Sequence, residues 1–245
     1  MLECPCVHSA SIVPSGRRDA FLETSPLSVQ PRDAPPVSEA PRFADERLAR
    51  TGQPHLARSL ADTALHITQT LNGQLPAEPA ISIDVPTTLD PSRAPEGKAI
   101  MRIQVLEIPN RPKGDAARSI DVGDGSWTAD LKQRFADRLI GIVGQHLPNV
   151  PGAILGMHVI TPGDIAAFTP NAGPCDPYGG SHDLAQSYLF RPLPGQPSHR
   201  TTVPNVHMLG AATWPGHGIN GGSGYIVAQE LPGTHPHAEK MAGAA

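Results

Sequence analysis

The sequence is poor in charge and in aromatic side chains. Charged residues make up 17% of the 245 residues, aromatic residues make up 4%, and the net charge is −4. A protein whose main partner is nucleic acid carries an excess of Lys and Arg, so nucleic acid is not expected as a partner. No apolar run approaches the roughly 18 residues of a membrane span, and no polybasic cluster suits an anionic membrane surface. We expect no membrane span and a cytoplasmic protein.

Metal, hydrolase and leader motifs are also missing. The sequence has three cysteines, of which Cys4 and Cys6 are separated by one residue, closer than the Cys-x-x-Cys of zinc sites. None of the 11 histidines forms a His-x-x-x-His pair. No Gly-x-Ser-x-Gly elbow and no P-loop lysine motif occurs. The N-terminus lacks a basic region followed by an apolar stretch, so no signal peptide is expected. We predict no metal site.

The first part of the chain has little hydrophobic periodicity. Residues 1–42 are rich in Pro, Ser, Arg and Ala, which is typical of a disordered or linker-like segment. The range 43–72 can form a helix with a partial apolar face. That face consists of Leu60, Leu65, Ile67 and Leu71.

Periodicity is clearer in the middle of the chain. Residues 80–85, 99–106 and 153–160 alternate or run apolar in the manner of strands. From Asp130 to Leu147 the apolar residues recur at helical spacing, which predicts an amphipathic helix capped by Ser126 or Thr128. Its apolar stripe consists of Leu131, Phe135, Leu139, Ile142 and Val143.

Residues 204–229 are the most informative part of the sequence. They predict a short buried strand from Val206 to Leu209, a glycine-rich turn, and a helix that opens near Gly221. Glycine has no Cβ, so such a turn lets backbone N–H groups approach a ligand closely. A helix N-terminus carries roughly half a positive charge and stabilises an anionic group. From the spacing alone, a plain loop is an equally open interpretation.

The wording of this stretch resembles a known family. Residues 209–218 and 221–224 resemble the C-terminal flavin-binding stretch of the phytoene-desaturase-like NAD(P)/FAD-dependent oxidoreductases. Two residues depart from the family pattern: Trp214 stands where His is common, and His217 interrupts a run of glycines. Further likenesses follow in family order, so that the resemblance covers roughly residues 55–231. They lie at residues 85–98, 147–150, 159–165 and 183–195.

One element of the family is missing. Its members begin with a βαβ unit that carries G-x-G-x-x-G and binds the ADP half of FAD. Here Gly16 is the only glycine among the first 50 residues, so the sequence resembles the C-terminal portion of a longer enzyme. The resemblance implies an α/β fold with α+β character, in which a partial FAD-binding domain joins a mixed-sheet substrate domain and the N-terminal Rossmann unit is missing. The expected division is 43–203 for the substrate domain, 204–231 for the strand, turn and helix of the FAD domain, and 232–245 for a tail.

The resemblance also implies a cofactor, a substrate class and a site. The cofactor is FAD, with NAD(P) as a second nucleotide left open. The substrate is an apolar small molecule, and a separate N-terminal half is a candidate partner. Among the histidines, His217 is the candidate for contact with substrate or flavin. The alternative is that His217 is a solvated loop residue. Arg191 is either a donor that fixes the loop or a contact near the flavin. The expected cofactor-binding residues are Gly210, Ala211, Gly216, Gly218, Gly221 and Gly222.

Two functions therefore remain open at this stage. The first is an FAD-dependent oxidoreductase of the desaturase or dehydrogenase kind, of which this chain is the C-terminal part and by itself inactive. The second is a non-catalytic fragment or interaction module that does not bind FAD.

Overall fold

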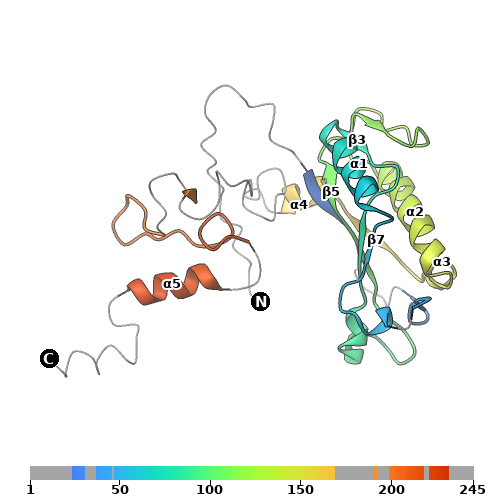
Figure 1. Cartoon of the computed structure of the whole chain (residues 1–245), viewed down its shortest axis with the longest axis horizontal. Coiled ribbons are helices and arrows are strands. Elements are labelled where there is room, and N and C mark those ends of the chain that lie inside the picture. Colours follow the sequence, from blue (N-terminus) through green and yellow to red (C-terminus); the bar gives the residue numbers. More distant parts are fainter. Residues whose placement is uncertain are drawn as a thin grey trace. The chain divides into compact units, whose positions relative to one another are not determined.

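Two compact units make up the chain in the computed structural model (Figure 1). The structure describes residues 24–30, 37–45, 47–168, 190–191, 199–217 and 221–231. The first unit, Leu22–Phe168, is called the sheet unit below. The second consists of Met1–Phe21 and Thr169–Ala245, and its described residues, which lie within 190–231, are called the turn unit. The sheet unit ends at Phe168, whereas the expected substrate domain ends at residue 203.

The sheet unit contains a five-stranded sheet with the order β2-β4-β5-β1-β7. The strands are β1 Thr24–Gln30, β2 His55–Leu56, β4 Ile81–Asp84, β5 Arg102–Pro109 and β7 His158–Ile160. Every pairing in this sheet is antiparallel. The only parallel pairing among the described residues joins β3 Gln74–Leu75 to β6 Gly114–Asp115 in a separate ladder. The mixture of helices and strands was predicted correctly, but the sheet expected to be mixed is antiparallel.

Strand β1 lies in a range that was expected to be linker-like. It pairs with β5 on one side and with β7 on the other, so it occupies an interior position in the sheet. Farther along, Val37 is 2% exposed and pairs with Ala99 and Ile154 through isolated bridges. The prediction for residues 1–42 is therefore wrong for these segments. Pairing with other parts of the chain holds these two segments in place, and the periodicity of their own sequences does not predict that pairing.

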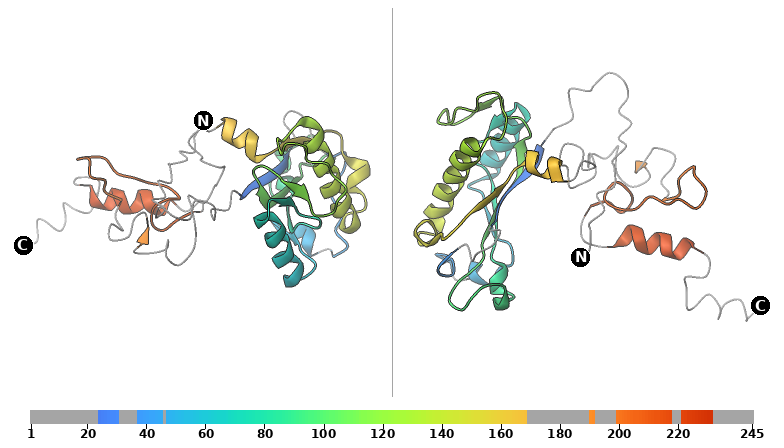
Figure 2. Two further views of the ribbon diagram at one scale, coloured as in Figure 1. Left: turned by 90° about the horizontal axis from the view of Figure 1, so that it is seen from above. Right: turned by 180° about the vertical axis from the view of Figure 1, so that it is seen from behind.

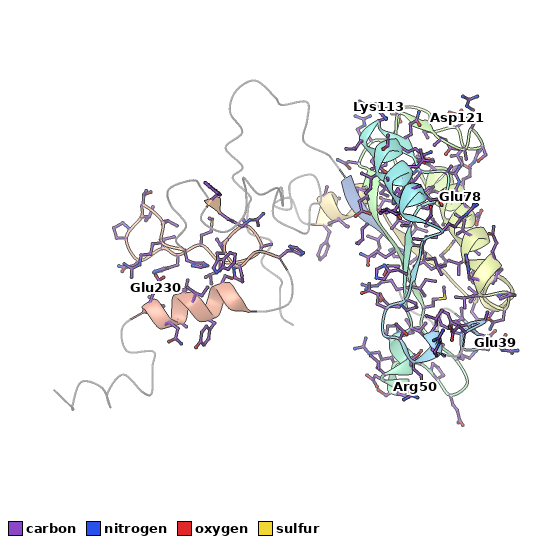
Figure 3. All side chains as sticks on the ribbon, viewed as in Figure 1. Glu39, Arg50, Glu78, Lys113, Asp121 and Glu230 are labelled. Atoms are coloured by element: carbon purple, nitrogen blue, oxygen red, sulfur yellow. The ribbon has the colours of Figure 1, made fainter. Side chains whose placement is uncertain are left out.

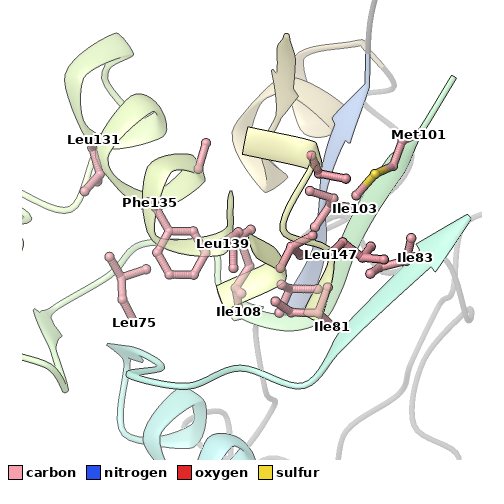
Figure 4. Packing of buried hydrophobic residues seen from close by; sticks show 14 residues of the cluster. Leu75, Ile81, Ile83, Met101, Ile103, Ile108, Leu131, Phe135, Leu139 and Leu147 are labelled. Carbon is pink, nitrogen blue, oxygen red and sulfur yellow. The ribbon is translucent and has the colours of Figure 1, made fainter. Parts of the chain in front are cut away.

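Helix α2, Ala129–His146, covers one face of the sheet, as the views in Figure 2 show. Thr128 caps it by accepting a hydrogen bond from the Leu131 N–H group, as one of the two expected caps. Phe135 and Leu139 are fully buried and point toward Leu75 and Ile108 (Figure 4). The predicted stripe is confirmed, and it packs on the apolar side chains of β4 and β5. The strand residues of this core are Ile81, Ile83, Ile103, Val105 and Ile108.

Helix α1, Leu60–Leu71, is confirmed as a helix but not in its orientation. The expected apolar face is turned outward: Leu60, Leu65, Ile67 and Leu71 are between 42% and 87% exposed. The buried positions are polar. His66 Nε2 lies 2.7 Å from the Glu107 carbonyl oxygen and Thr70 donates to the same oxygen, while the Ala80 N–H group donates to His66 Nδ1. These satisfied polar groups anchor the helix to the end of β5, and they outweigh the apolar pattern.

Short helices fill the connections of the sheet unit. They are η2 Leu48–Arg50, η3 Pro86–Thr88, η4 Pro91–Arg93, α3 Val150–Ala153 and α4 Pro162–Phe168. The strand predicted over 153–160 is confirmed only at its end, as β7. The predicted range begins with Ala153, the last residue of helix α3, and the strand starts at His158. At the start of α4, Asp164 accepts hydrogen bonds from Lys132 Nζ and from the Thr161 N–H group.

The turn unit contains α5, Gly222–Glu230, where a helix was expected. Glu230, labelled in Figure 3, lies at its C-terminal end and pairs with Arg200 at 3.0 Å. The strand predicted from Val206 to Leu209 is wrong: only an isolated bridge joins Arg200 to His207. Asn205, directly before the predicted strand, has a φ of 62° and lies where the chain reverses. Only a few backbone hydrogen bonds form around this reversal.

Candidate functional site

The expected flavin turn begins with two glycines in the left-handed region of backbone conformation. Gly210 has a φ of 107° and Gly216 a φ of 105°. Between them, Thr213 donates to the Gly210 carbonyl oxygen from its N–H group at 3.0 Å and from its hydroxyl at 2.9 Å. The Gly216 N–H group then donates to the Thr213 carbonyl oxygen at 2.7 Å. Positive φ explains why glycine stands at these two positions.

The N-terminus of α5 forms the second part of the candidate site. Its N-cap, Gly221, has a φ of 62°, and the Tyr225 N–H group donates to the Gly221 carbonyl oxygen to start the helix. A Cβ placed on Gly221 meets no atom within 4 Å. The first turn contains no acidic residue, so the partial positive charge of the helix end is not neutralised from within its own first turn. This helix end fits an anionic or electron-rich group.

Ser223 connects the turn to the helix. It lies in the first turn of α5, and its hydroxyl oxygen accepts a hydrogen bond from the Gly210 N–H group at 3.1 Å. The bond brings the start of the glycine turn to the N-terminus of α5. The two parts that the sequence placed in one site therefore meet in the structure.

Two buried side chains hold the turn from outside. Arg191, which is 5% exposed, donates to the Ala211 carbonyl oxygen. His199, which is 3% exposed, lies with Nε2 at 2.7 Å from the Trp214 carbonyl oxygen. The contact of Arg191 supports its interpretation as a donor that fixes the loop. The contact of His199 was not predicted, because its position in the sequence does not distinguish it from the other histidines.

The remaining predicted residues differ in their placement. Gly210, Ala211 and Gly216 lie in the turn, while Gly221 and Gly222 lie at the start of α5. His217 follows the turn and is exposed, whereas Gly218 lies outside the described residues. Tyr225, on the helix that follows the turn, is 67% exposed. In the described part of the chain, no group of three or more His, Cys, Asp or Glu residues is arranged to hold a metal ion.

Comparison with known proteins finds relatives of low sequence identity that are named as oxidoreductases or dehydrogenases. The chain is 26% identical over 164 residues to pyridine nucleotide-disulfide oxidoreductase domain-containing protein 2 of Rattus norvegicus, a match that covers 65% of this chain. It is 30% identical over 167 residues to phytoene dehydrogenase of Streptomyces griseus, covering 67% of this chain. The resemblance to the phytoene-desaturase-like oxidoreductases is confirmed. A limonene dehydrogenase polypeptide of Castellaniella defragrans is 27% identical over 175 residues, covering 69% of this chain.

These relatives are much longer than the part that matches. The chain spans 26% of the rat protein and 30% of the Streptomyces and Castellaniella proteins. No family model matches the chain. Where the structure describes helices, none combines the length and the apolar character needed to cross a membrane.

Proposed function

We propose that the chain provides the flavin-ring end of an FAD site and part of the substrate domain in an FAD-dependent oxidoreductase. When bound, the flavin supplies the redox chemistry by accepting hydride or electrons from the substrate. The residues of this chain bind and orient the flavin ring. The substrate is an apolar small molecule, a proposal supported by two relatives named for the hydrocarbons phytoene and limonene.

One observation carries this proposal. The Gly210 N–H group donates to Ser223, so the glycine turn and the N-terminus of α5 lie together, and this closeness supports a shared role in contacting the flavin. The space beside Gly221 is open to a ligand, since a Cβ there meets nothing within 4 Å. Backbone N–H groups at a helix end are suited to the electron-rich edge of a flavin or to negative charge on its reduced ring. The turn residues would hold the ring, and α5 would stabilise its charge.

The pyrophosphate of FAD needs a different element. In this family it is bound at the G-x-G-x-x-G turn of a βαβ unit, and no such motif occurs in this sequence. We therefore propose that the ADP half of FAD is held by a separate polypeptide or segment with that motif. A non-catalytic fragment or interaction module that binds no flavin is the second candidate.

Flavin binding distinguishes these two functions. The chain of residues 1–245 is titrated with FAD and, separately, with riboflavin. The change in flavin fluorescence measures binding. A site that contacts only the flavin ring binds both ligands weakly, because each net hydrogen bond contributes only about 1 kcal/mol. The two affinities should lie within about threefold of each other, because the ADP half of FAD adds less than one such hydrogen bond. The titration is repeated after adding the ADP-binding half of a relative such as Streptomyces griseus phytoene dehydrogenase. Retention of FAD only in the mixture supports the enzyme; no binding in either case supports the non-catalytic fragment.

A further inference from the structure

We propose that His199, rather than His217, is the histidine on which the flavin turn depends, and that it acts as a positioning residue. This proposal rests on the proposed function. The imidazole does not touch the flavin in this account. It holds the backbone of the turn in the shape that receives the ring.

The contact that carries the proposal is buried and specific. His199 is 3% exposed, and its Nε2 atom lies 2.7 Å from the Trp214 carbonyl oxygen. A carbonyl oxygen only accepts hydrogen bonds, so Nε2 carries the proton and donates. The contact with the turn therefore requires a proton on Nε2 of His199.

The backbone of His199 is itself fixed. Its carbonyl oxygen accepts a hydrogen bond from the Met208 N–H group at 2.7 Å, and the next residue forms a bridge with His207. The imidazole then reaches 15 residues along the chain to Trp214. His199 thus connects the segment that pairs through the Arg200–His207 bridge, before the turn, to Trp214 within the turn.

Three side chains hold the turn at three backbone groups. Arg191 binds the Ala211 carbonyl oxygen, His199 binds the Trp214 carbonyl oxygen, and Ser223 accepts from the Gly210 N–H group. Because the backbone must approach a flavin closely, small displacements of the turn weaken ring contacts. His217, by contrast, is exposed and follows the turn. The family pattern places a histidine where Trp214 stands; here an imidazole reaches the carbonyl of that residue from another segment.

The test replaces His199 by Phe and by Gln in the full chain combined with the ADP-binding half. Phe cannot donate, whereas the Gln side-chain amide can. His199→Phe should weaken flavin binding about five- to tenfold, as expected for one net hydrogen bond, and should shift the visible flavin band. His199→Gln should restore binding to within about twofold of the unaltered chain, consistent with the retained donor. His207→Phe and His207→Gln, at a half-buried histidine of the same segment, serve as matched controls. They should leave binding unchanged, because the bridge of His207 with Arg200 is formed by backbone atoms.

Flavin binding by His199→Phe equal to that of the unaltered chain overturns the proposal, as does equal loss in the His207 variants. A second measurement needs neither a variant nor a flavin. Nitrogen-15 NMR of the histidine rings in the unaltered chain should show a proton on Nε2 of His199. A ring protonated only at Nδ1 would contradict the contact. If the unaltered chain combined with the ADP-binding half binds no flavin but His199 carries a proton on Nε2, the proposed function fails while the contact stands, and the positioning role falls with the function.

Discussion

Arg138 and Asp115 form a bidentate ion pair inside the sheet unit, with Nη1–Oδ1 at 2.7 Å and Nη2–Oδ2 at 2.6 Å. The Asp115 side chain is 1% exposed and that of Arg138 is 11% exposed. Asp115 also accepts hydrogen bonds from the Ser119 and Ile120 N–H groups, and Arg138 donates to the Pro76 carbonyl oxygen. The pair thus joins α2 to β6 and to Pro76, the residue that follows β3.

Replacing Asp115 by Asn should strongly destabilise the sheet unit. The change leaves the Arg138 guanidinium buried without its counter-charge, which costs about 3–5 kcal/mol in comparable pairs. Urea unfolding followed by circular dichroism measures the change. Asp130→Asn is the matched control, because its pair with Arg134 is exposed on the same helix and contributes about 0.5 kcal/mol or less. Similar losses in the two variants would show that burial does not matter here.

The same carboxylate should make stability depend on pH. Burial acts to raise the pKa of Asp115, but hydrogen bonds from Arg138 and from the Ser119 and Ile120 N–H groups outweigh burial and leave the pKa lowered. A group whose pKa is lower in the folded state stabilises the fold above its unfolded pKa of about 4, and this contribution is lost as the pH falls through the folded value. The pKa of Asp164 is lowered in the same way by Lys132 and Thr161 against the effect of burial.

The free energy of unfolding should therefore fall as the pH is lowered from about 5 toward 2, in line with the unfolded carboxyl pKa. Urea titrations at several pH values test this. Asp115→Asn and Asp164→Asn should each flatten the dependence. An unaltered slope in both variants would contradict the assigned cause.

His66 should matter more to stability than the leucine beside it. His66→Phe removes the acceptor of the Ala80 N–H group and leaves the Glu107 carbonyl oxygen with Thr70 as its side-chain donor. An unsatisfied buried polar group costs about 1–3 kcal/mol. Leu65→Ser, at a position that is 53% exposed, should change stability by about 0.5 kcal/mol or less. Thermal unfolding of the two variants gives the comparison. A larger loss for Leu65→Ser would mean that the outer face of α1 is covered in solution.

Gly221 should tolerate Asn but not Val. At a φ of 62°, Asn adopts the left-handed conformation far more readily than a β-branched residue. No atom lies within 4 Å of an added Cβ, so the effect of Val comes from backbone strain and from obstruction of a ligand, not from a clash within the chain. Flavin content in the presence of the ADP-binding half should fall for Gly221→Val and remain for Gly221→Asn. Equal flavin content in the two variants would remove Gly221 from the site.

The elements with strong local patterns were predictable from sequence. Helix α2 has an apolar stripe and a capping threonine, and β5 alternates along its length, so local chemistry and tertiary packing agree. For α1 they disagree: the sequence indicates Leu60, Leu65 and Leu71 as the inner face, but His66 and Thr70 bind a strand carbonyl that no sequence pattern reveals. Strand β1 was missed for a similar reason, since its place depends on partners far along the chain.

The backbone conformation of the candidate site was predictable in part, while its binding role stays a prediction. Gly210, Gly216 and Gly221 all have positive φ, which glycine alone adopts without strain, so the sequence was informative there. His199 and Ser223 could not be singled out, because each acts through one hydrogen bond to a backbone group 13 to 15 residues away. Such contacts follow from how the turn folds back on its neighbours.

The visible spectrum of purified residues 1–245 tests the central claim most directly. The turn and the α5 N-terminus can contact only the flavin ring in this account, so the chain alone should be colourless after purification. Addition of FAD together with the ADP-binding half, followed by gel filtration, should yield a yellow complex containing both polypeptides. A chain that is yellow by itself with stoichiometric FAD would contradict the account, because the pyrophosphate would then be bound without the G-x-G-x-x-G unit.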